Sequence, residues 1–151
     1  MCFLPLRKLY KLLANTMGLI AEELLVKLVQ NTWVEDFAGR WILNEDTGGG
    51  DRDVNDFQYG LFRSDEPDAG DSCLSVIIAI ARLTEDKRHD GILAAGMLED
   101  FLGRHGADYI GVVEVLARKW PRFRYLLGGV WQGSMTKDVW HRVEAARGSP
   151  W

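Results

Sequence analysis

The chain has 151 residues, of which 47% are hydrophobic and 26% are charged. This length suits one compact domain, and the composition is that of a globular protein and not of a disordered one. A formal net charge of −4 argues against a nucleic-acid-binding surface that extends over the whole molecule. We therefore treat residues 1–151 as a single domain.

The first sixteen residues, MCFLPLRKLYKLLANT, mix apolar and basic side chains. No apolar run here approaches the ~20 residues that cross a bilayer, and no signal-peptide pattern follows. Residues 1–16 are predicted to form a separate N-terminal helix, packed on the domain or, alternatively, lying at a membrane surface. If its apolar face is exposed, we expect a homodimer through this helix. That face consists of Leu6, Leu9, Tyr10 and Leu13.

A helical stripe of apolar side chains follows at 20–29, and Trp33, Phe37 and Trp41 continue it at four-residue spacing. This pattern predicts a helix to about residue 43. Three consecutive glycines in NEDTGGGDRDVND then end the helix.

Residues 44–71 are predicted to form an acidic loop region, within which FQYGLF (57–62) is either a helical turn or a short strand. Eleven acidic and three basic side chains lie between residues 35 and 71. Such a segment is either a solvated loop or a contact for a basic surface of another protein. The residues assigned to this contact are Glu45, Asp46, Asp51, Asp53, Asp56, Asp65, Glu66 and Asp68.

The second half of the chain has cleaner helical periodicity. CLSVIIAIARLTED predicts a central buried helix, capped by Asp71 or Ser72. KRHDGILAAGMLEDFLGRHG predicts one or two helices that stop at Gly103 and Gly106.

ADYIGVVEVLARKW predicts a further amphipathic helix, which Pro121 closes. Two short helices complete the chain, the last one capped by Thr136 or Ser134. Because the connections are short, the sequence predicts an all-α fold of about six to seven helices, with antiparallel helical pairs stacked in the C-terminal half.

The segment LAAGMLEDFLGRHGADYIGVVEVLARKWPRFRYLLGGVW resembles an uncharacterised bacterial family, a domain of unknown function with the pattern AAGPLEDLL…HG…DPRFRRLLGGVW. The similarity covers about residues 73–147. Met97 replaces the proline of the pattern, and Lys119-Trp120 stands where the pattern has an acidic residue before Pro121. The resemblance implies a helical fold and supplies no activity or cofactor.

Glu99, Asp100 and His105 are the candidate chemical groups in this segment. Adjacent residues of a helix point about 100° apart, so Glu99 and Asp100 are poorly placed to act as a catalytic pair. Glu99 and Asp100 would lie at the start of a helix, where a negative charge interacts favourably with the helix dipole. His105 would lie near the end of that helix, where a histidine can cap the last carbonyl groups. The structural interpretation pairs the acids with Arg122 or Arg124, and the functional interpretation places these residues in a ligand or partner contact.

RKWPRFRYLLGGVW interleaves arginines with aromatic residues, a mixture found in protein interfaces and in single-strand nucleic-acid sites. The structural alternative buries Phe123 and Val130 and pairs the arginines with nearby acids. Gly128 and Gly129 are then expected to permit a tight turn that buries Trp131.

No metal-ligand, nucleophile-elbow or P-loop spacing occurs in the chain, so the sequence implies no metal and no cofactor. Cys2 and Cys73 have no local partner motif, which is typical of reduced thiols in a cytoplasmic protein. We predict a non-enzymatic protein-binding module, an inhibitory or immunity-type bacterial protein that covers a basic partner through its acidic surface. The alternatives are an anti-defence protein that mimics nucleic acid and a small enzyme with a Glu99/Asp100/His105 cleft.

Overall fold

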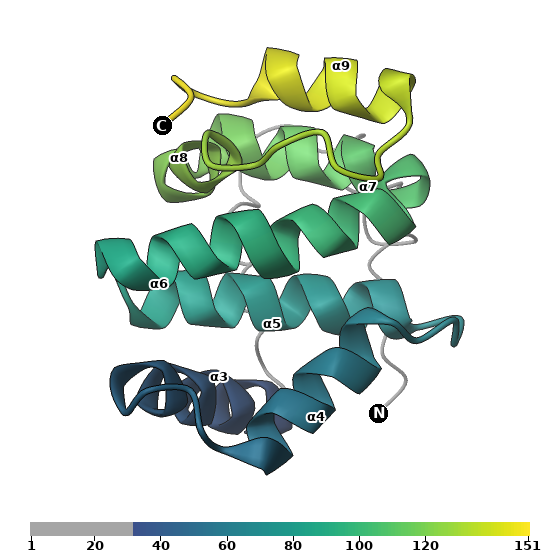
Figure 1. The fold of residues 1–151 in the computed structure, drawn as a ribbon. Helices are drawn as coiled ribbons and strands as arrows, with labels where there is room; N and C mark the ends of the chain where they lie inside the picture. Colours follow the sequence, from purple (N-terminus) through teal and green to yellow (C-terminus); the bar gives the residue numbers. More distant parts are fainter. Residues whose placement is uncertain (1–31) are drawn as a thin grey trace.

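The computed structural model describes residues 32–151, and every regular element in this range is a helix (Figure 1). The predicted all-α fold is therefore confirmed. The expectations for residues 1–16 and for the stripe at 20–29 concern residues outside this range. The elements are α3 (Thr32–Asp46), α4 (Arg52–Phe62), α5 (Ala69–Leu83), α6 (Lys87–Ile92), the π-helix η1 (Leu93–Leu98), α7 (Glu99–Lys119), α8 (Pro121–Leu127) and α9 (Lys137–Ala146).

The prediction of a loop region over 44–71 is wrong, because α4 occupies its middle. The three glycines do end α3, and Gly48 and Gly49 take positive φ angles of 97° and 74° that favour glycine. Directly afterwards the Asp51 side chain accepts a hydrogen bond from the backbone N–H of Val54 and caps a new helix. The turn is thus a short connection between two helices.

α4 is fastened to α3 by polar side chains as well as by apolar contact. The buried Asn44 accepts a hydrogen bond from the Asp51 N–H and donates one to Asn55 Oδ1. The Trp41 indole N–H donates to Gln58 Oε1 over 2.9 Å. Of the two alternatives for 57–62, the helical one is correct, because these residues form the second half of α4.

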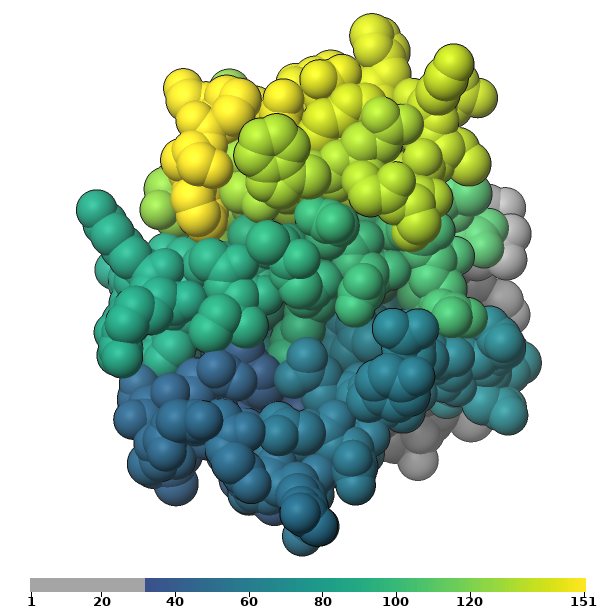
Figure 2. Space-filling model, viewed as in Figure 1, coloured from purple at the N-terminus to yellow at the C-terminus, as the bar shows by residue number. Residues whose placement is uncertain are grey.

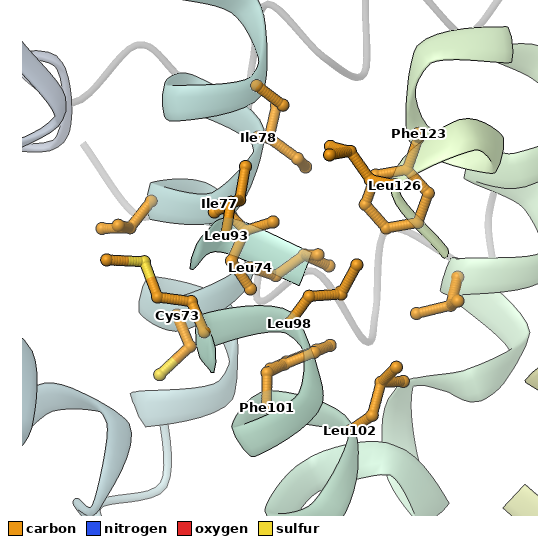
Figure 3. Close-up of a cluster of buried hydrophobic side chains, with 14 of the residues drawn as sticks. Cys73, Leu74, Ile77, Ile78, Leu93, Leu98, Phe101, Leu102, Phe123 and Leu126 are labelled. Atoms are coloured by element: carbon orange, nitrogen blue, oxygen red, sulfur yellow. The ribbon is translucent and has the colours of Figure 1, made fainter. Parts of the chain in front are cut away.

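The predicted central helix is confirmed as α5, in which every side chain from Cys73 to Ala81 is buried. Its start differs from the prediction: Asp68 is at the N-cap position, and Asp71 lies within the first turn. Figure 3 shows side chains of α5, η1, α7 and α8 pointing into one cluster. α5 is therefore the axis around which the other described helices pack.

From Lys87 to Lys119 the elements α6, η1 and α7 follow one another without a non-helical residue, although the stops predicted at Gly103 and Gly106 lie within this run. A straight helix would separate residues 90 and 119 by about 40 Å. Arg122 Nη1 nevertheless lies 2.9 Å from Asp90 Oδ2, so the run doubles back on itself (Figure 1).

The reversal falls beside the two glycines of α7. On one side of it Arg104 reaches Asp65, and on the other side Tyr109 reaches Asp71, so both arms meet at the start of α5. A Cβ atom on Gly106 would lie 2.8 Å from Val139 Cγ1 of α9. Gly106 was predicted to stop a helix; the helical run changes direction beside it, and its lack of a side chain lets α9 approach α7 closely.

The C-terminal half forms the predicted antiparallel stack. Pro121 begins α8 at its first turn, where a missing N–H is harmless, and the Thr136 side chain caps α9. Arg142 of α9 forms two hydrogen bonds with the carboxylate of Glu114 on α7, at 2.8 and 2.7 Å. This pairing lowers the pKa of Glu114 and ties the last helix to the stack.

Candidate functional site

The acidic residues assigned to a partner contact are all at the surface, with only Glu45 partly buried. Three of them have partners within the chain. Asp46 accepts from the buried His89 ring, Asp51 caps α4, and Asp65 pairs with Arg104. These three carboxylates therefore have structural roles that the sequence did not reveal.

The other five carboxylates make no side-chain hydrogen bond or ion pair with the described residues. They are Glu45, Asp53, Asp56, Glu66 and Asp68. Asp53 and Asp56 are three residues apart and so lie on neighbouring positions of α4; we call this pair the acidic face. Two aromatic side chains of the same helix are solvent-exposed, Phe57 at 45% and Tyr59 at 65%.

Glu99 holds the loop that follows α8. Its Oε2 atom accepts a hydrogen bond from the Trp131 backbone N–H at 3.1 Å. The carboxylate does not sit at a free helix start, because η1 precedes it and its own N–H is bonded to Ala94 and Gly96 carbonyls. The predicted helix-dipole role of Glu99 is therefore wrong, and so is its predicted pairing with arginine.

Gly128 and Gly129, the glycine pair of the family pattern, make room for the indole of Trp151. The sequence had predicted that they bury the indole of Trp131. A Cβ atom on Gly129 would lie 2.6 Å from the Trp151 ring and 2.9 Å from Ala94 Cβ. Trp151 in turn stacks on Tyr125 with ring centroids 5.0 Å apart. Trp131 itself is 70% exposed, so the prediction that the turn buries its indole is wrong.

The remaining members of the predicted polar cluster are dispersed. Arg122 forms a buried bidentate pair with Asp90, which raises the pKa of Arg122, and Arg124 is exposed on α8. His105 lies in the middle of the α7 run, and its Nε2 atom is buried without a hydrogen-bond partner in the described structure. Glu99, Asp100 and His105 do not line a common cleft, because tertiary packing gives each a different neighbour.

Sequence reasoning missed a buried polar network at the carboxyl end of α5. His89 is 3% exposed, with one ring nitrogen 2.7 Å from Thr84 Oγ1 and the other 2.9 Å from Asp46 Oδ1. Arg122 adds a hydrogen bond to the Thr84 carbonyl. Asp46 is 43 residues from His89, so no local sequence pattern could predict the contact.

A polar groove lies between α4 and α7, whose blue and green surfaces adjoin in Figure 2. It consists of two adjoining clefts of about 250 and 180 Å³, both bordered by Phe62, Arg63 and Asp100. The first also includes Gly103, Arg104 and Ser134, and the second Asn55, Gln58 and Tyr59. Asp100 is the one residue of the predicted polar cluster that borders it.

Residues 32–151 contain no group of three side chains placed to bind a metal ion. None of the helices in this range is both long and apolar enough to cross a membrane. Cys73 is buried, and burial raises the pKa of its thiol to about 12, so it is not an activated nucleophile.

The fold and these surfaces define an all-α domain of stacked antiparallel helices without a recognisable catalytic constellation in its described part. The chain belongs to a family of unknown function (DUF6869), whose model matches residues 50–150. This agrees with the resemblance to an uncharacterised family, and the match begins earlier than the 73–147 inferred from the motif. No curated protein and no solved structure matches the chain.

Proposed function

We propose that this chain is a non-enzymatic protein-binding domain, an inhibitory or immunity-type bacterial protein of the cytoplasm that covers a basic partner. The observation that supports this proposal is the acidic face, whose two carboxylates have no partner among the described residues. Glu45, Glu66 and Asp68 are three further unpaired acids of the same acidic segment. Surface carboxylates without a partner in their own chain can steer a basic protein into contact.

The acidic face also has aromatic neighbours that suit an interface. Exposed Tyr59 and half-exposed Phe57 lie on the same helix as Asp53 and Asp56. Aromatic side chains contribute most of the energy in many protein interfaces, whereas charges mainly set association rate and selectivity. A partner with a basic rim and an apolar centre would fit this combination.

The test is affinity capture from a bacterial lysate with two variants that remove the same charge. Asp53→Asn/Asp56→Asn neutralises the acidic face, and Glu85→Gln/Asp138→Asn neutralises two exposed acids elsewhere. We expect the wild type and the second variant to retain the same basic protein at low salt, and the first variant to lose it. Equal retention by both variants would overturn the proposal.

The same experiment addresses nucleic-acid mimicry. If the retained proteins were nucleic-acid-binding proteins displaced by added DNA, the acidic face would be acting as a mimic of phosphates. Retention of one basic protein that DNA does not displace supports the inhibitory role.

A further inference from the structure

The groove between α4 and α7 contains charges of both signs that do not neutralise one another. Asp100 is exposed and borders both clefts, and its side chain makes no hydrogen bond or ion pair with any described residue. Arg63 and Arg104 border the same space, and neither forms an ion pair with Asp100. An exposed ion pair gains little energy in water, so these charges need not pair with one another and stay available to a ligand.

Each arginine is positioned by a contact at the edge of the groove. The Arg63 guanidinium lies over the Tyr59 ring, 4.5 Å from its centroid. Arg104 Nη1 lies 2.6 Å from Asp65 Oδ1, in a pair whose carboxylate is 89% exposed. The contact with Tyr59 orients the Arg63 guanidinium before a ligand arrives, which reduces the entropy lost on binding. At Arg104 the exposed Asp65 carboxylate is free to exchange for the anionic group of a ligand.

The wall of the groove is also shaped by close packing. Gly103 leaves room for the Ser134 hydroxyl, which a Cβ atom at this position would strike. Phe62 is 4% exposed and closes the groove against the core. The space is therefore small, apolar at one point and polar elsewhere, as in many sites for small polar ligands.

We propose that this groove binds a dipolar molecule of about the size of an amino acid. Its carboxylate or phosphate would contact Arg63 and Arg104, and its ammonium group would pair with Asp100. Arginine binds both anions through paired N–H donors, and an aspartate is the natural partner of an ammonium group. A ligand with one charge would leave the opposite charges of the groove unmatched.

The size of the clefts sets the size of the ligand. The larger cleft, of about 250 Å³, is smaller than the ~300–1,000 Å³ pockets of drug-sized ligands. The charged groups of this site, Arg63, Asp100 and Arg104, do not belong to the acidic face, and Tyr59 borders both surfaces. The variants that test the two proposals differ, so the failure of one proposal is distinguishable from the failure of the other.

The first test is an NMR titration of the ¹⁵N-labelled full chain with glycine, β-alanine, γ-aminobutyrate and O-phosphoethanolamine. Acetate and ethylammonium are the single-charge controls. We expect saturable shifts of the Arg63, Asp100 and Arg104 amides with at least one dipolar probe, at lower concentration than with either control. O-phosphoethanolamine and β-alanine distinguish phosphate from carboxylate. The absence of saturable shifts with all four dipolar probes would overturn the proposal.

The second test uses variants with the probe that binds best. Asp100→Asn is expected to weaken its binding about tenfold or more, because one charge-assisted pair is lost, and to leave acetate binding unimpaired. Arg63→Gln should weaken both. Arg82→Gln removes an exposed arginine on α5 and is the matched control. Equal probe affinity in Asp100→Asn and Arg82→Gln would contradict the proposal, and unchanged spectra away from the groove establish that the variants fold.

Discussion

The two ends of α5 use the same residue types in opposite ways. At its carboxyl end Arg122 pairs with Asp90, and these two side chains are 14% and 3% exposed. Near its amino end Arg104 pairs with Asp65, and these two side chains are 35% and 89% exposed. Burial turns the first pair into an obligatory structural contact, whereas the second stays in water, where it contributes little stability and is free to exchange for a ligand.

Breaking the two pairs should therefore give very different losses of stability. Arg122→Leu leaves Asp90 buried and unpaired, which we expect to lower the free energy of unfolding by about 3–5 kcal/mol. Arg104→Gln should lower it by no more than about 1 kcal/mol, since solvent screens the surface pair. Urea unfolding followed by circular dichroism measures both.

A further variant sharpens this comparison. Asp90→Leu/Arg122→Leu removes both buried charges, so it should recover part of the stability that Arg122→Leu alone loses. Similar losses in Arg122→Leu and Arg104→Gln would show that burial does not distinguish the two ends.

A smaller effect is expected from two helical glycines with different surroundings, Gly39 of α3 and Gly106 of α7. Gly39→Ala in α3 meets no atom within 4 Å and should stabilise the protein by about 1 kcal/mol through helix propensity. Gly106→Ala gains the same propensity but places its Cβ 2.8 Å from Val139. Overpacking of this kind costs about 1–3 kcal/mol, so Gly106→Ala should cancel the gain or destabilise.

Thermal unfolding of the two glycine variants measures the difference. If Gly106→Ala were as stabilising as Gly39→Ala, the close approach of α9 to α7 would not be a constraint on that position.

The smallest expected effect is a pH dependence of the free energy of unfolding that arises from His105. Burial, and next the charge of Arg104, lower the pKa of His105 below its ordinary 6.5. The unfolded chain then binds the proton more readily, so protonation favours unfolding. Stability is present above pH 6.5 and declines as the pH falls from there towards the lower folded-state pKa.

His105→Phe keeps a ring between Phe101 and Tyr109 and removes the titrating group. Unfolding free energies at pH 7.5 and 5 should fall less in this variant than in the wild type. An identical decrease in both would assign the acid sensitivity to other groups.

Local patterns in the sequence determined much of the helical architecture. Trp33, Phe37 and Trp41 share a helical face, the continuous apolar run of α5 requires burial on all sides, and Thr136 caps α9. These features depend on residues within a few positions of one another, so hydrophobic spacing and capping chemistry reveal them. The loop predicted over 44–71 failed because capping by Asp51 outweighed the weak helix propensity of Asp and Asn.

Only the tertiary structure decided which polar groups meet. Asp90 rather than Glu99 pairs with Arg122, Asp46 reaches His89 across 43 positions, and Glu99 holds the backbone of Trp131. The groove around Asp100 likewise needs α4 and the reversal of α7 at Gly103 and Gly106. Such contacts depend on how the chain folds back on itself. Local sequence patterns predict which segments are helical, but not how the helices are arranged relative to one another.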